Sequence, residues 1–177
     1  MKALRKILFY IWQFTWGLPQ NIVGLIGFLV AKAHGREQEK FHNSYISYIS
    51  RKDFGGVSLG IFIFINTNVR DDRRHDMRIH EYGHTIQSAI LGPLWPFVIA
   101  LPSVIWCNTP YFRKLRKEKN VSYYRAYCEG WSNLCGLWGT KERFITKECL
   151  ERGRYGKPIN PNRNPAKDIK GRKYKKK

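Results

Sequence analysis

The amino-acid sequence predicts a mainly helical α+β protein with one small β-hairpin. Two long blocks without a charged residue, at 7–31 and 85–112, have the composition of apolar helices. Between them, residues 41–50 and 57–66 are rich in β-branched and aromatic residues and alternate as half-buried strands do. The strands are too few for a large sheet, so we expect a small hairpin packed on helices.

The chain of 177 residues has the length of one domain with a tail. We expect an N-terminal apolar membrane segment at 1–33 and a main domain at 34–150. The remaining residues, 151–177, contain three prolines, almost no apolar residues and a lysine run, so they predict a flexible basic tail.

The first uncharged block is longer than the ~20 residues that span a bilayer. Gly17, Pro19, Gln20 and Asn21 interrupt it, which predicts one kinked span or a short re-entrant hairpin. A cleaved signal peptide is the alternative, because basic residues come first and a small-x-small pattern ends at Ala33. The length and the polar break favour a retained membrane segment.

The two strands flank the sequence RKDFGG, whose two glycines predict a turn. Residues 57–66 are expected to form one continuous strand. One face of it would carry Val57, Leu59, Ile61, Ile63 and Ile65.

The next element is a helix that we expect to begin near Arg73, with Asp71 or Asp72 as its cap. Helical spacing then gathers several chemically interesting side chains on one face. They are Met77, His80, Glu81, His84 and Ser88.

The second uncharged block contains Pro93, Pro96, Pro102 and Pro110, so a straight helix is not expected. Two such blocks in a short chain predict an integral or tightly associated membrane protein, although a buried core loop and helix in a soluble protein is the alternative. A basic cluster at 113–117 follows the block directly. With the basic tail, it is expected on the cytoplasmic side.

The formal net charge of +19 favours anionic partners. The tail is either simply solvated or held at anionic membrane lipids. No DNA-binding or RNA-binding motif accompanies the charge, so nucleic acid is an unlikely partner. The four cysteines form no CxxC pair, which gives no support for a thiolate metal site.

The sequence HEYGHTIQS carries the strongest chemical signal. His80 and His84 are four residues apart, so on a helix both can direct a ring nitrogen to one ion. Zn²⁺ accepts such nitrogen ligands. Glu81 would lie beside the ion and can act as general base toward a water. A helix with two structural histidines is the alternative.

A catalytic zinc usually takes a third protein ligand. The position six residues after His84 is Ile90, which excludes a third histidine there, and all other histidines lie upstream. Glu129 is the preferred candidate, because its aromatic-rich surroundings predict a buried helix in which a carboxylate needs a partner. An ion pair with Arg125 is the alternative. Asn133 could accept a hydrogen bond from a histidine N–H and orient that ring.

The motif His80-Glu81-x-x-His84 followed by Glu129-x-x-x-Asn133 resembles the gluzincin metallopeptidases, to which thermolysin belongs. The resemblance implies one zinc held by His80, His84 and Glu129, with Glu81 as general base. It also implies that the strand at 57–66 pairs with an extended substrate, unless both edges of the hairpin are covered. Those peptidases usually have aspartate where this chain has Asn133. The longer strings HEYGHTIQS and LGPLWPFVIALPS resemble small uncharacterised bacterial membrane proteins with a zincin core.

The sequence therefore predicts a zinc-dependent, membrane-associated metallopeptidase that hydrolyses peptide bonds in a peptide or protein substrate. Two alternatives stay open: a non-catalytic zinc-containing membrane scaffold, and a polybasic protein that binds anionic lipid or nucleic acid. The group that would stabilise the oxyanion is also open. The candidates are Tyr82, Tyr123, Tyr124, Arg125 and Tyr127.

Overall fold

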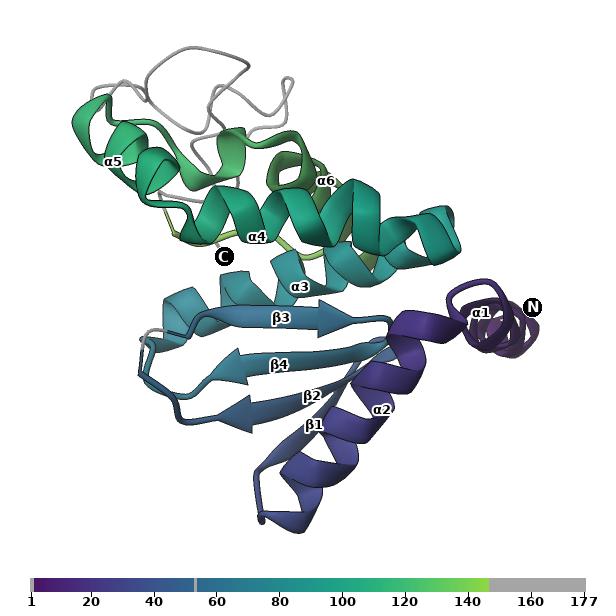
Figure 1. Cartoon of the computed structure of the whole chain (residues 1–177). Helices are drawn as coiled ribbons and strands as arrows, with labels where there is room; N and C mark the ends of the chain where they lie inside the picture. Colours follow the sequence, from purple (N-terminus) through teal and green to yellow (C-terminus); the bar gives the residue numbers. More distant parts are fainter. Residues whose placement is uncertain (1, 53, 147–177) are drawn as a thin grey trace.

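The computed structural model describes residues 2–52 and 54–146, so the predictions for the tail at 151–177 lie outside the described residues. The described chain is mostly helical with a four-stranded mixed sheet, which confirms the α+β class (Figure 1). In chain order the elements are α1 (Lys2–Thr15), α2 (Leu18–Ala33), β1 (Gln38–Phe41), β2 (Ser44–Ile49), β3 (Gly56–Leu59), β4 (Phe62–Asn66), α3 (Asp71–Leu91), η1 (Gly92–Leu94), η2 (Pro96–Ala100), α4 (Leu101–Asn108), α5 (Pro110–Glu118), η3 (Tyr123–Arg125) and α6 (Tyr127–Thr140).

The predicted single hairpin is wrong. The sheet has the order β1-β2-β4-β3, in which β1–β2 and β3–β4 are antiparallel pairs and β2–β4 is a parallel pair. Each of the two predicted strands is interrupted by a turn, at residues 42–43 in the first and at Gly60 in the second. The φ of Gly60 is 65°, a value that glycine adopts readily. The alternation of apolar residues continues across this turn, so the pattern in the sequence does not reveal it.

The sheet lies between two layers of helix, α2 on one face and α3 on the other (Figure 1). Toward α3, Ile63 and Ile65 pack with Tyr82 in a buried cluster. Toward α2, Phe62 and Phe64 pack with Phe28. Because both faces are covered, β4 is buried along its whole length.

The helix α3 begins at Asp71, two residues earlier than expected, and the predicted aspartate cap is wrong. Arg70 occupies the cap position without a side-chain cap hydrogen bond. Asp71 and Asp72 instead lie in the first turn, where a carboxylate interacts favourably with the helix dipole. The side chain of Asp72 accepts hydrogen bonds from the Arg70 guanidinium.

The first uncharged block bends by 97° between α1 and α2, at the polar residues that interrupt it. Three side chains, Gln13, Gln20 and Asn21, are buried at this corner. Gln13 donates to the carbonyl of Thr85 at 3.0 Å, and Asn21 accepts from the Ile61 backbone N–H at 2.9 Å. These bonds tie the corner to α3 and to the β3–β4 turn.

The second uncharged block is also bent, by 118°, at Trp95, between η1 and η2. Residues 92–108 thus form an arch that returns along α3. Within the described residues, no single helix is both long and apolar enough to cross a membrane, although each of the two bent pairs meets that test jointly.

Candidate metal centre

Two histidines of α3 and one glutamate of α6 converge on one point. One ligand atom from each of His80, His84 and Glu129 lies within 4.8 Å of the other two. The Glu129 Oε2 atom is 3.1 Å from His80 Nε2 and 3.6 Å from His84 Nε2. All three side chains are buried. The group could therefore hold a metal ion.

The close approach of α3 and α6 brings these side chains together. A Cβ atom at Gly83 would lie 1.9 Å from the carbonyl oxygen of Ser132, and one at Gly136 would lie 2.1 Å from that of Ile79. These contacts leave no room for a side chain, so each helix carries a glycine where the other helix crosses it. As a result, Glu129 reaches across the interface to the histidines.

The tautomer of His84 follows from its neighbours. The Gln87 amide nitrogen donates to the carbonyl of Cys128 at 2.9 Å, so its oxygen faces His84 Nδ1 at 2.7 Å and must accept there. His84 therefore carries a proton on Nδ1. In the neutral ring, the lone pair of Nε2 then points toward Glu129.

The second histidine is oriented in the same way. His80 Nδ1 lies 2.7 Å from Asn133 Oδ1, the position that the spacing of the sequence predicts for Asn133. When Asn133 accepts this hydrogen bond, the His80 Nε2 lone pair also points toward the carboxylate. Histidines that ligate metals commonly donate their other N–H to such an acceptor.

Glu129 leaves one oxygen free for a cation. Its Oε2 is buried and has no hydrogen-bond partner, although two histidine nitrogens lie close to it. The other oxygen, Oε1, accepts a contact of 3.8 Å from the Cys128 thiol. An unpartnered oxygen facing two imidazole lone pairs is unfavourable unless a positive ion lies between them. The donor set therefore fits a metal ion. No ion pair joins Glu129 to Arg125 in the described part of the chain, so that alternative is not seen.

Without a metal, a proton takes part of this role. Burial lowers the pKa of His80, but the close contact with the Glu129 carboxylate and its negative charge outweigh burial and raise the pKa to about 9. Burial likewise raises the pKa of Glu129, but the two histidines outweigh it and hold the pKa well below its usual range. The ionised Glu129 carboxylate therefore stabilises a positive charge between the three side chains.

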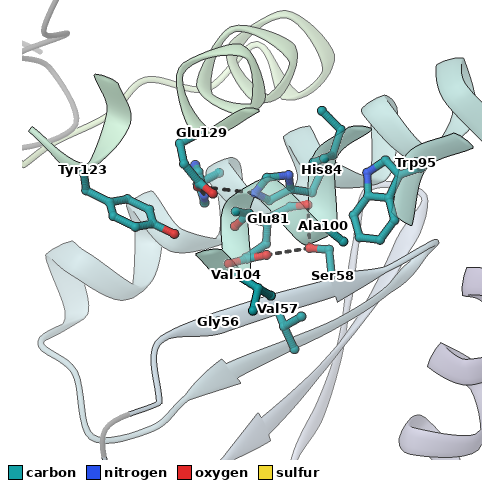
Figure 2. Close-up of a pocket in the computed structure, with 13 residues that line it drawn as sticks. Gly56, Val57, Ser58, Glu81, His84, Trp95, Ala100, Val104, Tyr123 and Glu129 are labelled. Carbon is teal, nitrogen blue, oxygen red and sulfur yellow. Dashed lines mark hydrogen bonds and ion pairs between the residues drawn. The ribbon is translucent and has the colours of Figure 1, made fainter. Parts of the chain in front are cut away.

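Glu81 lies beside this group and is held by the sheet. The Ser58 hydroxyl of β3 has two acceptors on Glu81, with Oε2 at 2.6 Å and the backbone carbonyl oxygen at 2.8 Å (Figure 2). A Cβ atom at Gly56 would lie 2.5 Å from Glu81 Oε1, so the absence of a side chain at Gly56 makes room for the carboxylate. Sequence reasoning does not find Ser58 or Gly56, because only the packing of β3 on α3 brings them to the site.

The group lies in a cleft whose empty space, together with the open solvent at its mouth, is about 400 Å³. One wall is the strand β3 and the other is the arch (Figure 2). The rim includes the exposed residues Val57 and Val104. The lining residues are Gly56, Val57, Ser58, His80, Glu81, His84, Trp95, Ile99, Ala100, Ser103, Val104, Tyr123 and Glu129.

Of the five candidate oxyanion donors, only Tyr123 lines the cleft, and its hydroxyl points into it (Figure 2). Burial, and then the charge of Glu129, raise the pKa of Tyr123 above its usual range, so the hydroxyl keeps its proton. Tyr82 packs in the core under the sheet, and the Tyr127 hydroxyl donates to the carbonyl of Val98.

The other two residues expected on the same face of α3 as His80, Glu81 and His84 do not line the cleft. Met77 packs against the hydrophobic core, and Ser88 accepts a hydrogen bond from Gln20. The spacing does contain a signal for Gln87, which follows His84 by three residues and so lies one helical turn away.

Comparisons with protein-family models, with curated proteins and with solved structures found no match. The function of the chain is therefore inferred from the geometry of its metal centre and cleft.

Proposed function

We propose that this protein is a zinc-dependent hydrolase that cleaves peptide bonds. The observation that carries the proposal is the buried group of His80, His84 and Glu129 with Glu81 in the same cleft. Two imidazole nitrogens and one carboxylate suit Zn²⁺, and three protein ligands leave a position for water, as in catalytic rather than structural zinc sites. Bound zinc would lower the pKa of water and polarise a carbonyl oxygen.

Glu81 is the proposed general base. Its carboxylate accepts a proton from the attacking water and passes it to the amine that leaves. The hydrogen bond from Ser58 fixes the direction of this carboxylate, while Asn133 and Gln87 fix the two histidine rings. Tyr123 is the proposed donor to the oxygen that becomes negative during attack.

The substrate would bind along β3. This strand is at the end of the sheet and pairs only with β4 among the described strands, so its other edge has free backbone groups. Because Gly56, Val57 and Ser58 line the cleft, an extended peptide paired with this edge would pass the metal centre. Backbone pairing of this kind suits a peptide better than a sugar or a phosphate ester.

The decisive test combines metal content with hydrolysis. Purified wild-type protein should hold about one zinc per chain, as expected for a single three-ligand site, and Glu129→Ala should hold much less. Glu81→Gln should keep zinc and lose about a hundredfold or more of the hydrolysis of an unstructured peptide. Zinc with no dependence of hydrolysis on Glu81 would contradict the mechanism and favour a non-catalytic zinc scaffold.

A further inference from the structure

The helix α2 has an inverted distribution of polar and apolar residues. Its buried residues are Gln20, Asn21, Gly24 and Ala31. Apart from Lys32 in the last turn, its exposed large residues are aliphatic: Leu18, Ile22, Val23, Leu25, Ile26, Leu29 and Val30. A helix that faces water shows the reverse pattern. The outer face of α2 therefore has the chemistry of a surface that faces hydrocarbon.

The same pattern occurs on two neighbouring segments. On α1 and at Trp16, which follows it, the large exposed apolar residues are Leu4, Ile7, Leu8, Ile11, Trp12, Phe14 and Trp16. In the segment 90–105, the large exposed apolar residues are Ile90, Leu94, Phe97, Val98, Leu101, Val104 and Ile105. We call these residues, together with the exposed residues of α2, the insertion surface. It is far larger than a solitary exposed side chain and calls for a partner.

The three segments meet where the two bends interlock. The Trp12 indole donates to the carbonyl of Ala89 at 2.7 Å, and Gln20 donates to that of Gly92 at 3.0 Å. A Cβ atom at Gly92 would lie 2.4 Å from the Trp16 ring. The exposed residues at the two corners thus belong to one surface.

Charge identifies lipid as the occupant. The uncharged segments are bounded by cations, with Arg5 and Lys6 before the first, Lys32 after it, and the cluster at 113–117 after the second. Lys40 of β1 is close enough to Lys6 that the like charge lowers the pKa of Lys6. An anionic leaflet offers both phosphates and hydrocarbon.

The bends indicate how deep the surface lies. A helix of 16 residues is about 24 Å long, against about 30 Å for the hydrocarbon core. At 97°, α1 and α2 cannot both run along the membrane normal. Gln13, Gln20 and Asn21 at the corner all donate hydrogen bonds within the protein, as insertion favours, and among these three side chains only Gln20 Oε1 is buried without a partner.

We propose that the insertion surface enters one leaflet of an anionic membrane and that the metal cleft opens at the level of the headgroups. The arch links the two features, because it presents Trp95, Ile99 and Ser103 to the cleft and Phe97 and Leu101 to the outside. Resting on the proposed function, the inference defines the substrates as polypeptide segments held at the membrane surface.

Vesicle flotation of the full chain tests the placement. We expect flotation with vesicles of phosphatidylcholine and phosphatidylglycerol, weaker flotation with phosphatidylcholine alone, and a loss of at least tenfold on Ile26→Glu or Phe97→Glu. Ile145→Glu is the matched control, because Ile145 lies outside the surface and is 59% exposed against 58% for Ile26. Equal flotation of Ile26→Glu and Ile145→Glu would overturn the proposal. The proposal would also be overturned if the protein formed a dimer in lipid-free detergent and Ile26→Glu dissociated it, because a second copy of the chain would then cover the surface.

The headgroup contact has its own control. The double variant Lys6→Gln, Lys40→Gln should weaken flotation with the anionic vesicles more than the control double variant Arg51→Gln, Lys52→Gln. The control residues lie in the β2–β3 connection, at the far end of the sheet from α1 (Figure 1). Equal effects would overturn the assignment of this pair to the headgroups.

Hydrolysis on vesicles tests the substrate class. An acylated peptide bound to anionic vesicles should be cleaved at least tenfold faster than the same peptide without its acyl chain. Ile26→Glu should remove this advantage and leave cleavage of the free peptide unchanged. Equal rates for both peptides with wild type would overturn the substrate class. Failure to cleave either peptide, with flotation intact, would refute the proposed function and leave the membrane placement standing.

Discussion

Individual residues at the centre divide into those that the sequence reveals and those that only the fold reveals. His80, Glu81 and His84 are four residues or fewer apart on one helix, so local geometry places them together. Glu129 is predictable because a lone carboxylate in a buried helix needs a partner, and it faces the two histidines. Ser58 has no such signal, because its contact with Glu81 depends on the turn at Gly60 and on how β3 lies against α3.

Ser58 provides a prediction at this scale. Ser58→Ala removes the hydrogen bond to Glu81 Oε2 and leaves the ligands untouched, so zinc content should stay unchanged while kcat falls about tenfold to a hundredfold. Ser58→Thr, which retains the hydroxyl, should restore part of the rate. A loss of zinc together with activity would instead indicate a structural role for Ser58.

Helices and strands explain where the expectations fail. The sequence predicts two strands, and the sheet has four, because alternation reports which side chains are buried but not where the chain reverses. The order β1-β2-β4-β3 is not predictable, since the parallel pairing of β2 and β4 is a long-range property. The bend in the first uncharged block is predictable from its polar residues, but their hydrogen bonds to α3 and to the β3–β4 turn are not.

The crossing of α3 and α6 supplies the second prediction. Gly136→Ala places a methyl group 2.1 Å from the Ile79 carbonyl, a backbone atom, so the helices must move apart. We expect a loss of about 1–3 kcal/mol of stability and at least tenfold weaker zinc binding, because Glu129 moves away from the histidines. Gly139→Ala is the control in the same helix, since its methyl meets only side-chain atoms of Ile86 and Tyr82. Equal zinc affinity of the two variants would refute this role of the crossing. Thermal denaturation and zinc titration measure both effects.

The stability of the whole molecule is linked to the charge at its centre. In the metal-free protein, the pKa of His80 is raised from 6.5 to about 9, so the protonated ring stabilises the fold. This contribution is complete below pH 6.5 and is lost as the pH rises toward 9. The low pKa of Glu129 acts in the opposite direction, with stability lost as the pH falls through its folded value.

The third prediction comes from this linkage. The thermal midpoint of the metal-free protein should decrease as the pH is raised from 6.5 to 9. Saturating zinc should raise the midpoint and make it less dependent on pH, because zinc replaces the proton. Differential scanning fluorimetry at several pH values, with and without zinc, measures both. Glu129→Gln should lose most of the slope. A metal-free midpoint that rises with pH over this range would contradict the assignment.

The corner between α1 and α2 has a consequence for how the protein is made. Gln13 and Asn21 leave the ribosome long before their partners at Ile61 and Thr85 exist. At about 5–20 residues per second, synthesis from residue 21 to residue 85 takes on the order of three to thirteen seconds. During that interval Gln13 Nε2 and Asn21 Oδ1 lack these partners, although Asn21 Nδ2 can already donate to Gln13 and Gly17. The N-terminal helices can therefore complete their structure only after α3 is made, although they are made first. Conditions that slow elongation would lengthen the period in which the nascent chain is exposed to aggregation or proteolysis.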